Sequence, residues 1–131
     1  MDEINQVFKL PDHLQLVAHF SFPRVQTWGT RRDQEYKAAI RAAANLTLGS
    51  GEKHDWFVFS IRCVVGESRG RYHRQTPDVE NIPKLIVDAF TGVLYPDDHL
   101  QYVRGVQVEA EFGIDEKEQA EVWIFGCPKK G

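Results

Sequence analysis

One short amphipathic segment, residues 81–92, constrains the fold more than any other stretch of this chain. Pro83 has no backbone N–H and is tolerated only in the first turn of a helix, so a helix is expected to begin near Glu80 or Asn81. At about 100° per residue the apolar side chains of that helix share one face, which predicts burial against a sheet. They are Ile82, Leu85, Ile86, Ala89 and Phe90. Gly92 then ends the helix as a left-handed C-cap.

Carboxylates stand on both sides of this predicted helix. Asp78 and Glu80 precede it on an extended approach, where residues two apart point to the same side. Asp97 and Asp98 follow it after Pro96, and a turn there would bring the chain back toward the helix. Carboxylates held close together repel one another, and a divalent cation removes that penalty. Hard oxygen ligands favour Mg²⁺, with Mn²⁺ as a substitute, so the sequence predicts a magnesium site made by these four side chains.

The polar face of the helix adds a cation to this group of carboxylates. It carries Asn81, Lys84, Asp88 and Thr91. A metal held by carboxylates activates water for in-line attack on a phosphodiester, and Lys84 could neutralise the charge that develops on the phosphate. The spacing leaves an alternative open, in which Asp97 and Asp98 form a solvated turn and Lys84 and Asp88 are an ordinary surface ion pair.

The pattern D-x-(D/E)-N-x-x-K, followed by D-A-x-x-G-x-x-Y-x-D-D-x-x-Q, runs from Asp78 to Gln101. It closely resembles the signature of the RusA family of Holliday junction resolvases. The resemblance implies a set of catalytic metal-binding carboxylates, an essential lysine and supporting polar residues. The carboxylates are Asp78, Glu80 and Asp98, with Asp97 beside them, the lysine is Lys84, and the supporting residues are Asn81 and Asp88. The family usually has Asp in place of Glu80, whose extra methylene moves the carboxylate by about one carbon–carbon bond.

The resemblance also implies a substrate, a quaternary structure and a biological setting. The family cuts four-way DNA junctions by paired symmetric nicks during recombination and repair, and it occurs widely in phages and prophages. Since a four-way junction has near-twofold symmetry, a symmetric homodimer is expected. Two other functions stay open: a broader nuclease that cuts flaps and other branched DNA, and a DNA-binding protein whose carboxylates hold no catalytic metal.

The distribution of charge bears on DNA binding. The formal net charge of −3 is unfavourable for a DNA-binding protein, but the four proposed metal ligands account for more than all of it. Basic residues gather in residues 24–41 and 62–74, where they could form a phosphate-contacting face or be solvated surface alone. The candidates for phosphate contacts are Arg24, Arg31, Arg32, Arg69, Arg71 and Arg74.

Hydrophobic periodicity predicts the remainder of a single domain spanning residues 1–131. Alternating apolar residues predict strands over 13–20, 55–65, 103–112 and 120–127, and a further helix is expected over 33–48. The order β, α, β, α, β, β indicates an α+β (mixed α/β) domain, with the helices packed on a mixed sheet of about four strands.

These patterns also assign a direction to many side chains. The central strand presents Phe57, Phe59, Ile61, Cys63 and Val65 on one face, and the third strand presents Val106, Val108, Ala110 and Phe112 inward. On the helix over 33–48, which Asp33 is expected to cap, Lys37 and Arg41 fall on the exposed side. Its apolar face is formed by Tyr36, Ala39, Ile40, Ala43 and Ala44. Trp123 and Phe125 face away from Val122 and Ile124, so either a second subunit or the long helix of the same chain is expected to cover them.

Several classes of protein find no support in the sequence. No apolar run approaches the length of a membrane span, and the first ten residues do not resemble a signal peptide. Cys63 and Cys127 are too few for a disulfide scaffold, so we expect reduced thiols in a cytoplasmic protein. The sequence has neither zinc-type Cys/His spacing nor a nucleotide-binding loop, so we expect no zinc and no nucleotide cofactor.

Overall fold

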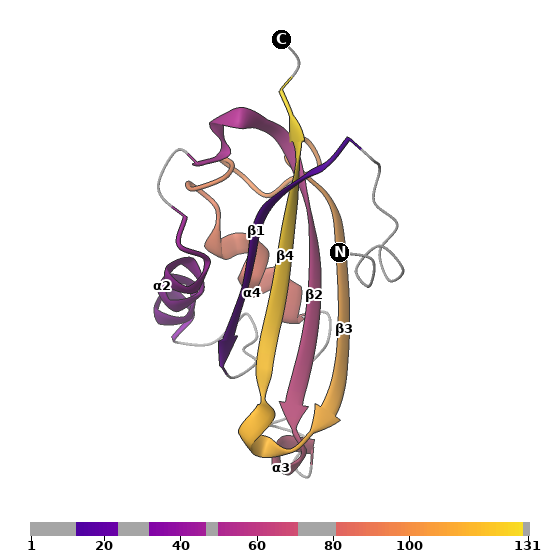
Figure 1. Ribbon diagram of the computed structural model, residues 1–131. Coiled ribbons are helices and arrows are strands. Elements are labelled where there is room, and N and C mark those ends of the chain that lie inside the picture. Colours follow the sequence, from indigo (N-terminus) through magenta and orange to yellow (C-terminus); the bar gives the residue numbers. More distant parts are fainter. Residues whose placement is uncertain (1–12, 24–31, 47–49, 71–80, 130–131) are drawn as a thin grey trace.

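The computed structural model describes residues 13–23, 32–46, 50–70 and 81–129. Within them the chain forms a four-stranded mixed sheet in the order β1-β4-β2-β3, together with three helices. In Figure 1, α4 lies behind the sheet and α2 lies beside it, next to the β1 edge. The predicted α+β class and the sheet of four strands are therefore confirmed.

The elements follow one another in the predicted order, except that the short helix α3, which was not predicted, lies between β2 and α4. The strands are β1 (Gln15–Pro23), β2 (His54–Gly66), β3 (Val103–Gly113) and β4 (Gln119–Pro128). The helices are α2 (Asp33–Ala44), α3 (Glu67–Gly70) and α4 (Asn81–Ala89), with short 3-10 turns η1 (Ser50–Lys53) and η3 (Asp115–Lys117). Strands β2 and β3 are parallel and are joined through α4, whereas β4 pairs antiparallel with both β1 and β2.

The core forms where one face of β2 meets the apolar face of α4. The five alternating residues predicted for that face of β2 are all buried, and so are the five predicted for the helix, each at most 1% exposed. Alternation with period two on the strand and a period of 3.6 on the helix both concentrate apolar groups on one side. Each fully buried side chain of this size contributes about 1.5–3 kcal/mol, so this contact fixes the position of α4 on the sheet.

Helix α2 differs from its prediction at both ends and on one face. It ends at Ala44 rather than residue 48, because Asn45 adopts a left-handed conformation with φ 57°. Arg32 is the N-cap residue and Asp33 makes no side-chain cap. Ala39 is exposed, and the placement of Lys37 and Arg41 on the exposed side is wrong, since both side chains reach α4. The reason is that α2 packs against α4 as well as against β1.

The two edge strands also depart from their predictions. Strand β1 begins at Gln15 and continues to Pro23, into the predicted loop, and a register shift between Leu16 and Ala18 leaves Leu16 48% exposed. Strand β3 carries its apolar side chains on the same face as those of β2, as predicted. Val106 and Phe112 nevertheless remain 42% and 55% exposed, because β3 lies at the edge of the sheet.

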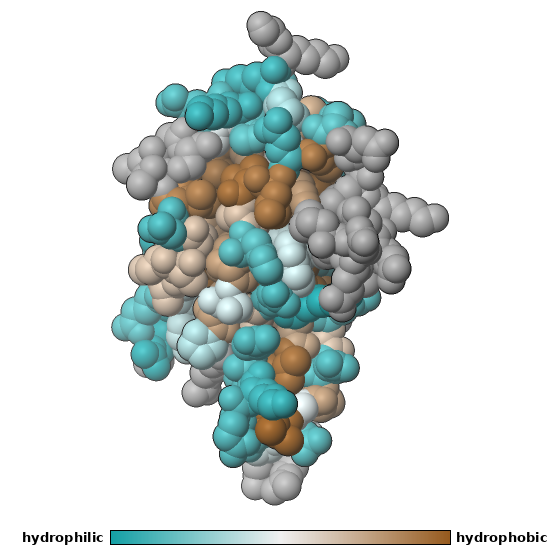
Figure 2. Space-filling model, in the orientation of Figure 1, coloured by the Kyte–Doolittle hydropathy of each residue, from teal (hydrophilic) through white to brown (hydrophobic). Residues whose placement is uncertain are grey.

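The opposite face of the sheet carries a second, smaller apolar cluster. Val58, Trp123 and Phe125 are buried there, and Leu14 and Trp56 pack against them. Figure 2 views this face, where hydrophobic residues gather across the upper half and hydrophilic residues cover much of the lower half. Both α2, the longest helix, and α4 pack instead into the main core with Val122 and Ile124. The interpretation that the long helix of the same chain covers Trp123 and Phe125 is therefore wrong.

None of the helices in the described residues is long and apolar enough to cross a membrane.

Candidate active site

The structure describes part of the predicted site. Asn81, Lys84, Asp88, Asp97 and Asp98 are described, as are two of the candidate arginines, Arg32 and Arg69. The remaining predicted residues lie outside the described ranges; they are Asp78, Glu80, Arg24, Arg31, Arg71 and Arg74. The geometry that follows therefore concerns the polar face of α4 and the loop that leads from α4 to β3.

Helix α4 separates its polar and apolar residues as the sequence predicts. Pro83 is its third residue, in the first turn where a missing N–H removes no intrahelical hydrogen bond. Lys84 is exposed, whereas Asn81 and Asp88 are half-buried on the same side of the helix. Burial of the other side against β2 leaves this polar face available to solvent and to the following loop.

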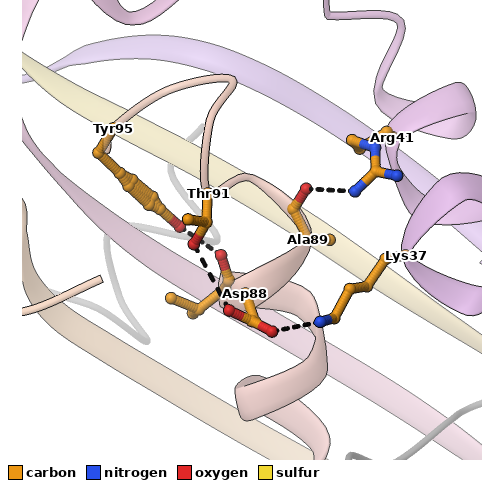
Figure 3. Close-up of polar contacts among 7 residues, drawn as sticks. Lys37, Arg41, Asp88, Ala89, Thr91 and Tyr95 are labelled. Atoms are coloured by element: carbon orange, nitrogen blue, oxygen red, sulfur yellow. Dashed lines mark hydrogen bonds and ion pairs between the residues drawn. The ribbon is translucent and has the colours of Figure 1, made fainter. Parts of the chain in front are cut away.

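The loop after α4 turns back toward the helix. Gly92 has φ +87°, a conformation that side chains disfavour, and its N–H donates to the Tyr95 carbonyl oxygen at 2.7 Å. The buried ring of Tyr95 then returns to α4, where its hydroxyl donates to the Val87 carbonyl oxygen (Figure 3). This contact anchors the start of the segment that carries Asp97 and Asp98 to the last turn of α4.

Burial and two nearby carboxylates affect the Tyr95 hydroxyl. Burial raises the pKa of Tyr95 well above its usual value of 10, and the negative charges of Asp98 and Asp88 raise it further. Asp88 lies on the polar face of α4, and Asp98 lies in the loop after it. The hydrogen bonds from Gly92 to Tyr95 and from Tyr95 to Val87 bring the start of this loop back to α4, as the glycine stop predicted.

Asp88 is held by a partner that the sequence did not indicate. Its carboxylate forms an ion pair with Lys37 of α2, and it accepts a long hydrogen bond of 3.5 Å from the Thr91 hydroxyl (Figure 3). Arg41, one turn further along α2, donates to the Ala89 carbonyl oxygen at 3.0 Å. The last turn of α4 is thus held by two side chains of α2, Lys37 and Arg41, whose contacts the sequence analysis did not predict. The spacing of Lys37 and Arg41 at i and i+4 on an alanine-rich helix was the available signal.

Asp97 and Asp98 lie on an exposed turn. The Asp97 carboxylate accepts the Asp98 N–H at 2.7 Å, and the turn closes where the Tyr102 N–H donates to the His99 carbonyl oxygen at 2.9 Å. The ring of His99 rests against that of Tyr102, with centroids 5.1 Å apart. One oxygen of the Asp97 carboxylate is thus engaged within the turn, and both aspartates are exposed.

The donor chemistry of this turn fits a hard divalent cation. Asp97 and Asp98 offer carboxylate oxygens, which Mg²⁺ and Mn²⁺ prefer, on a solvent-exposed segment. In the described part of the chain no three His, Cys, Asp or Glu side chains come together closely enough to hold a metal ion. A complete metal site of the predicted composition therefore needs Asp78 and Glu80 as well, and the assignment of these four residues stays a prediction.

The two described arginines have acidic partners. Arg69 on α3 forms an ion pair of 3.0 Å with Glu118, and their side chains are only 19% and 11% exposed. Glu118 also accepts the Gly66 N–H at 2.8 Å, so this pair ties α3 to the turn before β4. Arg32 forms an exposed ion pair with Glu35 at 2.8 Å. Phosphate would have to compete with Glu118 for Arg69 and with Glu35 for Arg32.

A comparison with protein families accounts for this combination of fold and residues. The chain matches the family model described as Endodeoxyribonuclease RusA over residues 14–124. This match includes β1, β2, β3, α4, the Asp97–Asp98 turn and the first part of β4, up to residue 124. The chain therefore belongs to the RusA endodeoxyribonuclease family, whose members act on branched DNA and resolve Holliday junctions. No curated protein gives a significant match to the chain.

Proposed function

We propose that this protein is a Mg²⁺-dependent endonuclease that resolves four-way DNA junctions by paired symmetric nicks during recombination or repair. Family membership supports the class of activity. The observation that carries the proposal is the Tyr95 hydroxyl, which joins the loop of Asp97 and Asp98 to the end of the helix that presents Lys84. A carboxylate turn and an exposed lysine on neighbouring elements are the parts that phosphodiester hydrolysis requires.

The proposed division of labour follows from the chemistry of each side chain. Asp78, Glu80 and Asp98, helped by Asp97, hold Mg²⁺, and Mn²⁺ can replace it. When bound, the cation supplies activation of water and neutralisation of phosphate charge. Lys84 stabilises the negative charge that develops on the scissile phosphate. Asn81 and Asp88 support this arrangement from the polar face of α4, and the candidate arginines contact the DNA backbone; they are Arg24, Arg31, Arg32, Arg69, Arg71 and Arg74.

The proposed assembly is a homodimer. A four-way junction has near-twofold symmetry, and two symmetric incisions need two active sites related by the same symmetry. We place the protein in the cytoplasm, in a phage, prophage or host setting. The burial of Cys63, which raises its pKa to about 12, agrees with a thiol that stays reduced and unreactive.

Two alternative functions make different predictions for the same substrates. A broader branched-DNA nuclease would cut flaps as readily as four-way junctions. A DNA-binding protein without a catalytic metal would bind in a salt-dependent way and cut nothing, and the exposed turn at Asp97 and Asp98 would then be ordinary solvated surface. Membership of an endodeoxyribonuclease family favours the nucleases over the binding protein.

The test is cleavage of a labelled four-way junction beside a flap and a linear duplex of matched sequence, with Mg²⁺, Mn²⁺ or EDTA. Symmetric nicks on the junction that appear only with metal support the proposal. Equal cutting of the flap would establish the broader nuclease instead. Binding without cutting in either metal would contradict the proposed activity, and the Glu80→Asp variant would then show whether the departure from the family pattern is responsible.

A further inference from the structure

One cleft formed by the described residues lies beside the proposed active site and has no part in the mechanism above. Its volume is about 810 Å³, within the range of sites that bind small ligands. Four segments line it: η1 with the first residues of β2, residues 92–96 after α4, residues 101–104 at the start of β3, and Lys129 after β4. It therefore sits at the end of the sheet where β2 and β3 begin, at the top of Figure 1.

This cleft is continuous with the loop of proposed metal ligands. Pro96 and Gln101 both line the cleft, and Asp97 and Asp98 lie between them in the chain. A DNA strand that reaches the aspartates would therefore pass the mouth of the cleft within the length of one short turn. The cleft is placed to receive a part of the same DNA molecule, next to the phosphate that is cut.

The lining of the cleft combines cations with aromatic rings. The Arg104 guanidinium lies 5.0 Å from the centroid of the Trp56 ring, and Arg104 is exposed. Tyr102 and Lys129 also line the cleft. Aromatic rings and arginine planes are the groups on which unpaired bases stack, and a guanidinium can bind a phosphate at the same time. These groups match a nucleotide whose base is not paired.

The acidic residues of the cleft argue against duplex DNA as its occupant. Glu52 and Asp55 line the same cleft and offset the charges of Arg104 and Lys129. The phosphate backbone of a duplex binds best to a surface that is positively charged throughout. Carboxylates beside a stacking platform suit the exposed edge of a base instead, since they accept hydrogen bonds from the amino group of cytosine.

The walls of the cleft are held by main-chain contacts, so the cleft is formed before any ligand binds. A Cβ atom added at Gly51 would lie 2.0 Å from the Leu94 carbonyl oxygen, which means that η1 packs directly on the loop after α4. The Phe57 N–H donates to the Tyr102 carbonyl oxygen at 2.7 Å. A preformed site loses little conformational freedom on binding, which favours capture of a transiently open base.

We propose that this cleft binds one unpaired nucleotide at the branch point of the DNA substrate, with its base stacked on Arg104. Opening a base pair in a continuous duplex costs a few kcal/mol, and this cost is smallest where strands exchange or end. The cleft would therefore favour branched DNA over linear DNA and would fix the position of the scissile phosphate relative to the branch. This inference rests on the proposed function, because it requires a branched-DNA substrate.

The test compares Arg104→Ala with Lys117→Ala, which removes an exposed cation from η3 between β3 and β4. Binding of a four-way junction and of a linear duplex is measured in EDTA over a range of salt concentrations. We expect Arg104→Ala to weaken junction binding about tenfold, as loss of one stacked base would, and to reduce the salt slope by about 0.7–0.9. Lys117→Ala should match the wild type. Equal behaviour of the two variants would overturn the proposal.

Two further measurements separate stacking from charge and separate this proposal from the proposed function. Arg104→Lys keeps the positive charge and loses the flat guanidinium. The salt dependence of junction binding should therefore match that of the wild type, while the preference for the junction over the linear duplex should be lost. A 2-aminopurine at the branch point should change its emission with wild-type protein and not with Arg104→Ala. If wild-type protein cuts junctions normally but shows no such change, the cleft proposal alone fails. If wild-type protein neither prefers nor cuts branched DNA, the proposed function itself fails.

Discussion

Lys37 on α2 and Asp88 on α4 form an ion pair that joins these two helices (Figure 3). Their side chains are 14% and 32% exposed, so the pair is substantially shielded from water. Arg41 reinforces the contact at the Ala89 carbonyl oxygen, and Tyr95 does so at Val87. The last turn of α4, which leads into the loop of Asp97 and Asp98, is therefore held both by α2 and by Tyr95 of that loop.

Replacing Lys37 with methionine should destabilise the protein measurably. Lys37→Met keeps most of the apolar stem and leaves the half-buried Asp88 carboxylate without this partner, so we expect the free energy of unfolding in urea to fall by about 1–3 kcal/mol. Glu35→Gln is the matched control, because it breaks the exposed Arg32–Glu35 pair of the same helix. That variant should lose less than about 1 kcal/mol. Losses of equal size would contradict a structural role for the Lys37–Asp88 pair.

Removing the Lys84 ammonium should slow cutting far more than it weakens binding. Lys84 is exposed on the polar face of α4, where an ammonium that acts on the transition state contributes to rate and little to ground-state affinity. We expect Lys84→Ala to lower the single-turnover rate with Mg²⁺ by about 10²–10³-fold. Junction affinity in EDTA should change by only a small factor. The reverse pattern would assign Lys84 to DNA binding.

The elements that local sequence controls were predictable. Pro83 lies in the first turn of α4 and Gly92 has the predicted positive φ, although the helix ends at Ala89, three residues before Gly92. The buried face of β2 followed from strict alternation. In these segments a single short-range rule decides the conformation, so the sequence alone suffices.

Contacts between elements were not predictable in the same way. Lys37 and Arg41 lie on the polar side of α2, and only the packing of α2 on α4 turns that side inward. Likewise, β3 has the predicted alternation, but its place at the edge of the sheet leaves Phe112 exposed. A helical or strand pattern gives the direction of a side chain. It does not say which element the side chain meets.

Alkaline pH should destabilise the protein through Tyr95. Burial, followed by the charges of Asp98 and Asp88, raises the pKa of Tyr95 above its value of 10 in an unfolded chain. Above pH 10 the unfolded chain loses this proton while the folded protein keeps it, so the free energy of unfolding falls as the pH rises. Tyr95→Phe should lower stability at pH 8 by about 1 kcal/mol, through the lost hydrogen bond to Val87. Its decline between pH 9.5 and 11 should be shallower than that of the wild type, and parallel curves would refute the assignment.

Acid pH should also destabilise the protein, through His54. Burial, and then the neighbouring charge of Lys53, lowers the pKa of His54 below its ordinary value of 6.5. Below pH 6.5 the unfolded chain takes up this proton before the folded protein does, so stability falls as the pH is lowered toward the folded-state pKa. His54→Gln should lose less stability between pH 7.5 and 5 than the wild type. Lys53→Met should reduce the loss in part without altering the ring, and no difference for either variant would contradict the prediction.

The adjacent aspartates should respond differently to the same chemical change. Asp97 accepts the N–H of Asp98 at 2.7 Å, and an asparagine at position 97 retains an oxygen that can accept that bond. We therefore expect Asp97→Asn to preserve the turn and to reduce cutting only in part. Asp98→Asn removes a carboxylate that the proposal assigns to the metal, so cutting should be abolished while the variant folds and binds the junction as the wild type does. The measurements are urea unfolding, junction binding in EDTA, and cleavage over a titration of Mg²⁺ and Mn²⁺. If Asp98→Asn loses folding and binding together with cutting, Asp98 is a structural residue of the turn, and the metal must be sought elsewhere.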